Sequence, residues 1–194
     1  MSTNKNSVRI ISGNKRGSKI HFDSAPGLRP SGDRVREILF SWVQTSIEGS
    51  ACLDMFAGSG ALGFEAASRG AARVCMLEKN RSVVAVLNQN KERLQFDNIT
   101  VLAADAMQAS TYPLLPGDDN RFDFIFIDPP FNDGLHQSAI ELLQHQQLLN
   151  PGAFVYVEVA KNTTEPNVPA AWELYREKIA GDVRVFLYRT IAAE

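Results

Sequence analysis

The chain has 194 residues, of which 44% are hydrophobic and 22% charged, and this is the composition of one ordinary folded domain. Its apolar runs are too short to span a membrane and its first thirty residues are polar, so we expect neither a membrane protein nor a signal peptide, but a cytoplasmic protein. Cys52 and Cys75 lie within apolar runs and are expected to be reduced core residues. The histidines show no ligand spacing, so no metal site is expected.

Charge is unevenly distributed along the chain. Residues 1–36 carry eight basic and two acidic side chains, a net charge of +6, whereas the remaining residues carry a net charge of −8. A basic arm on an acidic body suggests a polyanionic partner, although a solvated charged face would explain the pattern equally well. The basic residues that could hold a phosphate backbone are Arg9, Lys15, Arg16, Lys19, Arg29, Arg34 and Arg36.

Residues 1–42 are expected to form a small extension that precedes a main domain at residues 43–194. Val8–Ser12 and Lys19–Phe22 predict a β-hairpin that turns around residues 13–17. A helix should follow, with Arg34 and Arg36 pointing where solvent or a ligand can reach them; the alternative is that one of them pairs with Glu37 or Asp33 on the helix surface. Its apolar face is expected to carry Val35, Ile38, Leu39 and Trp42.

From residue 51 onward, apolar runs alternate with helical patterns, which is typical of βαβ units on a parallel sheet. The strand-like runs are Ala51–Met55, Arg73–Leu77, Ile99–Ala103, Phe122–Ile127 and Ala153–Val159. The helix-like stretches are Ala61–Arg69, Ser82–Leu94, a short one near Ala106, and Leu135–Gln146. Trp172–Ile179 and Val183–Arg189 are separated by hairpin length and should be antiparallel. We therefore predict a Rossmann-like α/β fold with a mostly parallel seven-stranded sheet that ends in an antiparallel hairpin.

A glycine-rich turn follows the first of these strands. Gly58, Gly60 and Gly63 match the spacing GxGxxG, which allows backbone to approach a ribose but does not separate a nicotinamide cofactor from S-adenosylmethionine. Asp54 lies just before the turn, where a carboxylate attracts the methionine ammonium group and would repel a pyrophosphate. This acid favours the methyl donor.

Acids also follow three further strands. Glu78 is placed to take both ribose hydroxyls, Asp105 could accept the adenine amino group, and Asp128 follows the fourth strand. Each of them alone could be a surface carboxylate or a helix cap, but ligands of open α/β sheets bind at the carboxyl ends of strands. The predicted cofactor-binding residues are Asp54, Phe56, Ala57, Gly58, Ser59, Gly60, Glu78, Lys79, Asp105, Ala106 and Asp128.

The tetrapeptide Asp128-Pro129-Pro130-Phe131 ends the apolar run at residues 124–127. A carboxylate and a carbonyl that accept both N–H bonds of a base amine would free its nitrogen lone pair for attack. The prolines fix the backbone and remove N–H donors, and the phenylalanine offers a face on which a base can stack. These four residues are the predicted catalytic residues, and the alternative is a strand that simply ends in a proline turn.

The glycine-rich turn, Glu78, Asp105 and the proline tetrapeptide resemble class I S-adenosylmethionine-dependent methyltransferases that modify base amines. The N-terminal region adds a likeness to the RsmD family, and together the likeness runs from Val8 to Arg189. The sequence departs from the family pattern at Ser12, Lys15 and residues 31–32, which leaves the hairpin tip and the helix entry open. The N-terminal segments that carry the likeness are Arg9-Ile10-Ile11-Ser12-Gly13, Arg16-Gly17, Leu28-Arg29-Pro30 and Asp33-Arg34-Val35-Arg36-Glu37.

The resemblance implies methyl transfer from S-adenosylmethionine to N2 of one guanine in 16S rRNA, guanine 966 in the conventional numbering. It also implies a monomer that acts on the assembled small ribosomal subunit and holds the RNA through the basic arm. A DNA or RNA adenine-N6 methyltransferase would use the same tetrapeptide. A nicotinamide-dependent reductase would explain the glycines and Glu78, and a non-catalytic RNA-binding protein would explain the arm alone.

Overall fold

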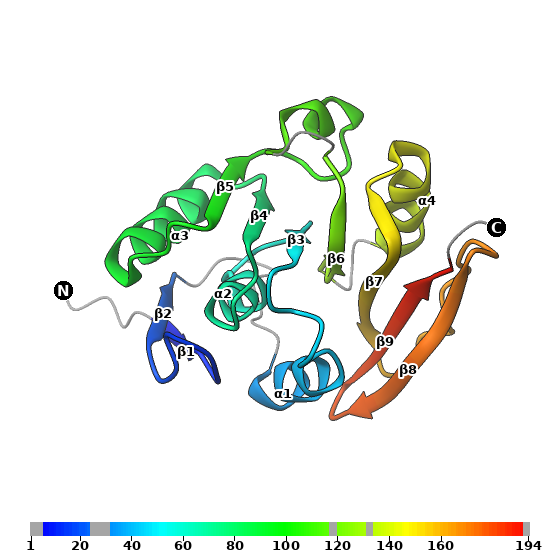
Figure 1. Cartoon of the computed structure of the whole chain (residues 1–194), viewed down its shortest axis with the longest axis horizontal. Helices are drawn as coiled ribbons and strands as arrows, with labels where there is room; N and C mark the ends of the chain where they lie inside the picture. The colour runs from blue at the N-terminus through cyan, green and yellow to red at the C-terminus, as the bar shows by residue number, and fades with distance from the viewer. Residues whose placement is uncertain (1–5, 24–31, 117–119, 131–133, 192–194) are drawn as a thin grey trace.

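The computed structural model describes residues 6–23, 32–116, 120–130 and 134–191. Its main sheet has seven strands in the order β5-β4-β3-β6-β7-β9-β8 (Figure 1). Strands β3 to β7 are mutually parallel, and β9 pairs antiparallel with both β7 and β8, so the predicted mixed sheet is confirmed. The strands are β3 (Ala51–Asp54), β4 (Arg73–Glu78), β5 (Ile99–Ala103), β6 (Phe122–Ile127), β7 (Leu149–Ala160), β8 (Trp172–Ala180) and β9 (Val183–Thr190).

Helices cover both faces of this sheet, which is why its central strands are apolar on both sides. Phe124 and Phe126 of β6 pack into one cluster, whereas Ile125 and Ile127 pack into the other. The first cluster includes residues of α1 (Asp33–Trp42), α2 (Ala61–Ser68) and α3 (Arg81–Leu94), and the second those of α4 (His136–Gln146) and the 3₁₀ helix η1 (Ala109–Leu114). No helix in the described ranges is long and apolar enough to cross a bilayer.

The two cysteines confirm the expectation that they are core residues. Cys52 and Cys75 are both buried and unpaired, one on each face of the sheet. Burial disfavours the thiolate and raises the pKa of each thiol to about 12. Both thiols are therefore protonated at neutral pH and act as apolar packing groups.

The N-terminal hairpin packs on the same core as the sheet. β1 (Asn6–Arg9) pairs antiparallel with β2 (Lys19–Phe22), and the apolar side chains of both strands join the first cluster. Gly13 at the hairpin turn has φ +85° and touches α2 so closely that a Cβ would lie 1.8 Å from the Ser68 carbonyl oxygen. The hairpin is thus seated directly on the helix that follows the glycine-rich turn.

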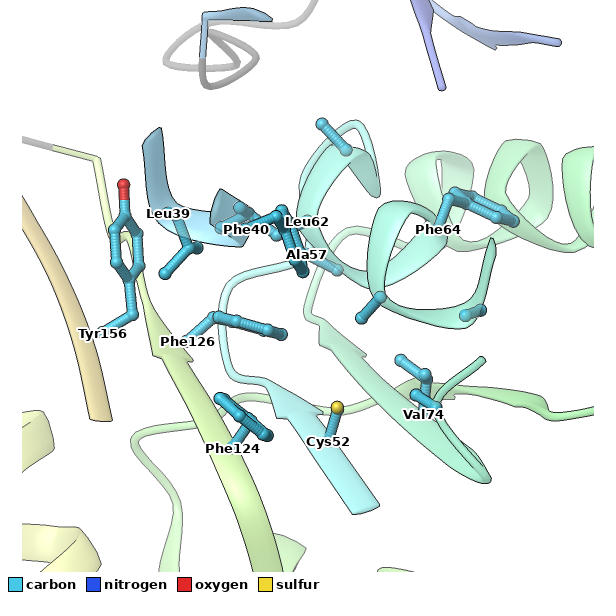
Figure 2. Close-up of a cluster of buried hydrophobic side chains, with 14 of the residues drawn as sticks. Leu39, Phe40, Cys52, Ala57, Leu62, Phe64, Val74, Phe124, Phe126 and Tyr156 are labelled. Atoms are coloured by element: carbon cyan, nitrogen blue, oxygen red, sulfur yellow. The ribbon is translucent and has the colours of Figure 1, made fainter. Parts of the chain in front are cut away.

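Helix α1 buries a wider face than the one expected: all four predicted residues pack on the core, Val35 and Leu39 as buried and Ile38 and Trp42 as partly buried side chains. Its buried residues are Val35, Arg36, Leu39 and Phe40. Figure 2 shows Leu39 and Phe40 beside Phe126 and Tyr156 of the sheet. The apolar pattern did not include Arg36, because one of its ionic partners, Glu65, lies on another helix.

Candidate active site

The carboxyl ends of the parallel strands surround a pocket of about 630 Å³. All four acids that the sequence places at strand ends line it: Asp54, Glu78, Asp105 and Asp128. The structure therefore brings together side chains that are up to 74 positions apart, as the strand-end pattern predicts. Of the other predicted cofactor contacts, the pocket wall also includes Phe56, Ala57, Gly58, Ser59, Lys79 and Ala106.

Asp54 is the most deeply buried of these acids, at 1% exposure. Its Oδ2 accepts the backbone N–H of Gly63 at 3.2 Å, whereas its buried Oδ1 has no hydrogen-bond partner. Burial raises the pKa of the Asp54 carboxyl to about 7, against the effect of nearby N–H groups, and the Glu78 carboxylate raises it further. An unpartnered buried carboxylate oxygen beside a pocket is a site for a cationic or hydrogen-bond-donating ligand group.

Glu78 ends β4 and holds the loops around it. Its two oxygens accept the backbone N–H groups of Gly58, at 3.1 Å, and Asn80, at 2.8 Å. Each of these oxygens retains capacity for another donor, because a carboxylate oxygen has two lone pairs. A half-buried carboxylate fixed in this way is suited to a ligand with two adjacent hydroxyl groups.

Gly60 has another role from the one expected. It is described but is not part of the pocket wall: it is the N-cap of α2, with φ +78°, and its N–H bonds to the Ala57 carbonyl at 2.7 Å. A Cβ at Gly60 would come within 2.7 Å of Phe64 and Leu87. We therefore assign Gly60 to the turn and its packing rather than to ligand contact.

The loop after β5 carries Asp105 into the pocket and is fastened by η1. Asp105 Oδ1 accepts the N–H of Met107 at 2.9 Å, which closes a local turn. The Thr111 hydroxyl donates to the Asp105 carbonyl at 2.7 Å, and the Tyr112 hydroxyl to the Ala106 carbonyl at 2.6 Å. Asp105 was expected to be either a ligand-binding acid or a structural carboxylate. The structure shows features of both, because one oxygen supports the loop while the side chain lines the pocket.

Asp128, Pro129 and Pro130 follow β6 and line the same pocket as the cofactor-side acids. Pro129 is buried and Pro130 is exposed, so the chain turns from the sheet toward the surface at this point. Phe131, the fourth predicted catalytic residue, lies outside the described residues. The structure therefore places three of the four at the pocket.

Two further acids of the pocket wall, Glu158 and Asp182, were missed by the sequence analysis. Glu158 of β7 also lines the pocket and is 4% exposed. Its Oε2 accepts the Tyr156 hydroxyl at 2.7 Å, and its carbonyl oxygen bonds His136 Nε2 at 2.8 Å. The signal that could have revealed it is an acid within an otherwise apolar strand, next to the strand that carries Asp128.

The basic residues of the N-terminal extension divide into three groups. Arg9, Arg16, Lys19 and Arg34 are exposed, and Arg34 also lines the pocket. Lys15 is half-buried, with its Nζ 5.9 Å from the centre of the Phe96 ring. Arg29 lies outside the described residues.

The expected availability of Arg36 to solvent or RNA is wrong, because its side chain is fully buried. Its guanidinium bonds Asp33 Oδ1 at 2.6 Å, the Arg9 carbonyl at 3.0 Å and Glu65 Oε2 at 3.4 Å. Glu65, also fully buried, accepts the N–H groups of Ile11 at 2.7 Å and Ser12 at 3.0 Å. Arg36 therefore helps to fasten the hairpin to α1 and α2.

Comparison with known proteins agrees with this geometry. A family model described as "Conserved hypothetical protein 95" matches residues 8–189. The chain is 43% identical over 182 residues to Ribosomal RNA small subunit methyltransferase D of Escherichia coli, covering 94% of this chain and 89% of the relative. It is also 43% identical to the protein of the same name from Haemophilus influenzae, covering 95% of both chains.

A solved Escherichia coli structure superposes with a TM-score of 0.86 at 40% sequence identity, and the match covers 97% of this chain and all of the other. The match therefore includes the N-terminal hairpin as well as the mixed sheet. The chain is a member of the RsmD family and has the class I methyltransferase fold.

Proposed function

We propose that this protein transfers a methyl group from S-adenosylmethionine to the exocyclic N2 of a guanine in 16S rRNA. The observation that carries the proposal is the meeting of Asp128 and Pro129 with three cofactor-side acids around one pocket. Relatives at 43% identity are named for methylation of small-subunit ribosomal RNA, which supports the substrate class and gives no support to a nicotinamide reductase.

The cofactor side of the pocket has the groups that S-adenosylmethionine requires. The unpartnered Asp54 Oδ1 would receive the ammonium group, Glu78 would accept both ribose hydroxyls, and Asp105 would accept the adenine amino group. Phe56, Ala57, Gly58, Ser59, Lys79 and Ala106 would enclose the molecule. When bound, the cofactor supplies a methyl group on a sulfonium sulfur that departs as the amine nitrogen attacks.

The protein mainly aligns the guanine amine with the methyl group. Its only acid–base role is to accept a proton from that amine. Asp128 and the Pro129 carbonyl would accept the two N–H bonds of the guanine amine and hold its nitrogen toward the methyl carbon. As positive charge forms on that nitrogen, the Asp128 carboxylate would stabilise it and receive the proton. Phe131 would stack on the base, which has to be unpaired or flipped out.

The N-terminal extension would hold the RNA backbone, and we divide the chain into this arm (residues 1–42) and the catalytic domain (43–194) by role. Phosphate contacts give affinity and register rather than sequence choice. The candidates that the structure leaves accessible are Arg9, Lys15, Arg16, Lys19 and Arg34, with Arg29 retained from the sequence. We also propose a cytoplasmic monomer that acts on the assembled small subunit.

The deciding experiment is methyl transfer from labelled S-adenosylmethionine, with digestion of the product to nucleosides. Unmethylated small ribosomal subunits, naked small-subunit RNA and DNA would be compared at equal concentration. We expect N2-methylguanosine, with subunits the best substrate and position 966 the modified base. N6-methyladenine in DNA, or no transfer to any substrate despite tight cofactor binding, would overturn the proposed function.

A further inference from the structure

We propose that Glu158 reads the N1–H of the target guanine and thereby restricts the enzyme to guanine. This inference rests on the proposed function. Glu158 lines the pocket but belongs to neither the glycine-rich turn nor the proline tetrapeptide.

The sheet places Glu158 beside Asp128. In the register of the parallel strands β6 and β7, Ile127 pairs with Val157, so the next residues on the two strands are Asp128 and Glu158. Neighbouring parallel strands lie about 5 Å apart, and residues paired in register point to the same face. Both side chains line the pocket, so two carboxylates meet on the wall where the base amine would be held.

The surroundings of Glu158 fix the direction of its carboxylate. The Tyr156 hydroxyl donates to Glu158 Oε2 at 2.7 Å. Burial, and the negative charges of Glu158 and Asp128, raise the pKa of Tyr156 well above its ordinary value, so this hydroxyl remains a donor. Tyr156 itself is fixed by the sheet core, where its ring meets Phe126 edge-on at 6.3 Å (Figure 2).

The backbone of Glu158 is held from the other side of the sheet. His136, the first residue of α4, bonds the Glu158 carbonyl oxygen through Nε2 at 2.8 Å. Burial lowers the pKa of His136 below its ordinary value, so the ring is neutral at pH 7 and carries its proton on the nitrogen that donates. A residue whose backbone is held by His136 and whose carboxylate is held by Tyr156 is suited to discrimination between bases.

Guanine presents two adjacent donors on this edge, the N2 amine and N1–H, whereas adenine presents one amine and a bare N1 acceptor. If Asp128 and the Pro129 carbonyl hold the amine, N1–H still requires an acceptor, because a buried donor without a partner costs about 1–3 kcal/mol. Glu158 is the carboxylate beside Asp128. Facing adenine, the same carboxylate would meet a nitrogen lone pair and repel it.

The test uses RNA in which the target guanine is replaced by 2-aminopurine. This base keeps the amine at C2 but has a bare N1 acceptor. The readout is the ratio of kcat/KM for guanine to kcat/KM for 2-aminopurine, in subunits reconstituted with ligated RNA. We expect the wild-type protein to prefer guanine by at least about 100-fold, because a site built around a donor rejects a base that lacks it.

Glu158→Gln exchanges one acceptor oxygen for an N–H donor of the same size, so we expect this ratio to fall at least about tenfold. Tyr156→Phe removes the orienting hydroxyl and should lower the ratio in the same direction, and it decides the matter if Glu158→Gln does not fold. Asp105→Asn is the matched control: it neutralises a pocket acid on the cofactor side, so the rates should change equally for both bases.

An unchanged ratio in the folded Glu158→Gln protein would overturn the inference. A fall of cofactor affinity beyond tenfold without a change in base preference would also overturn it, because Glu158 would then serve the cofactor. Failure of the wild-type protein to form N2-methylguanosine is a separate result that would overturn the proposed function instead.

Discussion

The acids of the pocket and the basic residues of the N-terminal extension differ in how the fold holds them. Asp54 is buried and Glu78, Asp105 and Asp128 are half-buried at strand ends, where the sheet fixes each Cα. The basic side chains instead lie on a hairpin and a helix, and most of them are exposed. The pocket is therefore built for fixed geometry, and the extension is suited to adaptable contacts with a charged chain.

The largest effect should come from Asp128, where geometry and charge act together. We expect Asp128→Ala to lower methyl transfer at least about 1000-fold, because it removes both the amine acceptor and the charge that stabilises the attacking nitrogen. Cofactor affinity should stay within about tenfold, since the change lies on the base side of the pocket. Single-turnover transfer and calorimetric titration measure the two quantities separately, and an equal loss of both would contradict this role.

The buried ion pair between Arg36 and Glu65 tests whether the extension is fastened as the structure shows. We expect Glu65→Ala to lower the free energy of unfolding by about 3–5 kcal/mol, because Arg36 and Arg69 each lose an ionic partner and two hairpin N–H groups lose their acceptor. Urea denaturation measures the effect.

Glu177→Ala is the control for this substitution, since Glu177 forms a partly exposed pair with Arg184 at 2.7 Å. Removal of this exposed partner should cost less than about 1 kcal/mol. Equal losses in the two variants would mean that the buried pair contributes no more than a surface pair, and that the hairpin is held by its apolar contacts and its other hydrogen bonds, such as those from the Asn14 and Lys15 N–H groups to Ser68.

Sequence patterns predicted the pocket better than the extension, for a physical reason. Asp54, Glu78 and Asp128 each follow an apolar run, and the parallel sheet that those runs require brings strand ends together whatever the side-chain packing. The burial of Arg36 depends instead on Glu65, which is 29 positions away on another helix. The local pattern contains Asp33, which pairs with Arg36 at 2.6 Å, but it does not contain Glu65, so the sequence indicated a surface residue.

Glu158 was missed for a related reason. Strand β7 is an apolar run, in which a single acid is an interruption rather than a pattern, and its importance follows only from the register of β7 against β6. Gly60 shows the converse, because the GxGxxG spacing suggested contact with a ligand where the structure shows a turn packed against Phe64 and Leu87.

The exposed basic residues can be tested without disturbing the fold. Arg16 and Lys19 are both exposed on the hairpin, and we expect reversal of both to Glu to weaken binding of small subunits while the melting temperature stays constant. Loss of two phosphate contacts should reduce the slope of log affinity against log salt by about 1.5 to 2. Binding measured over a salt series gives the slope.

The same charge change at the opposite edge of the sheet is the control for the hairpin. Arg176 of β8 and Arg189 of β9 are exposed and lie at the other end of the strand order from β5 and α3, beside which the hairpin packs, so their reversal to Glu should leave the salt slope unaltered. Equal effects of the two double variants would mean that only the net charge of the protein matters and that the hairpin is no RNA-binding surface.

The smallest expected effect is a dependence of cofactor affinity on pH, which follows from the ionisation of the buried Asp54. The raised pKa of about 7 means that the ligand-free pocket holds a mostly neutral carboxyl at pH 6 and a mostly ionised one at pH 8. An ammonium group binds the ionised form, so cofactor affinity should rise about tenfold between these pH values. Isothermal titration over this range measures the affinity, and Asp54→Asn should give a weaker affinity that no longer rises in this way.

The same shift of pKa has a consequence of opposite sign for the stability of the ligand-free protein. Asp54 keeps its proton in the folded state up to pH about 7, whereas the unfolded chain releases it near the ordinary value of 3.8. The unfolded state therefore binds fewer protons in this window, and the contribution of Asp54 to stability falls as pH rises from about 4 to 7. Asp54→Asn lacks this contribution. The melting temperature of the variant should therefore increase relative to that of the wild type as pH rises from about 4 to 7. A difference that stays constant with pH would show that the carboxyl is ionised throughout and that its burial does not tune cofactor binding.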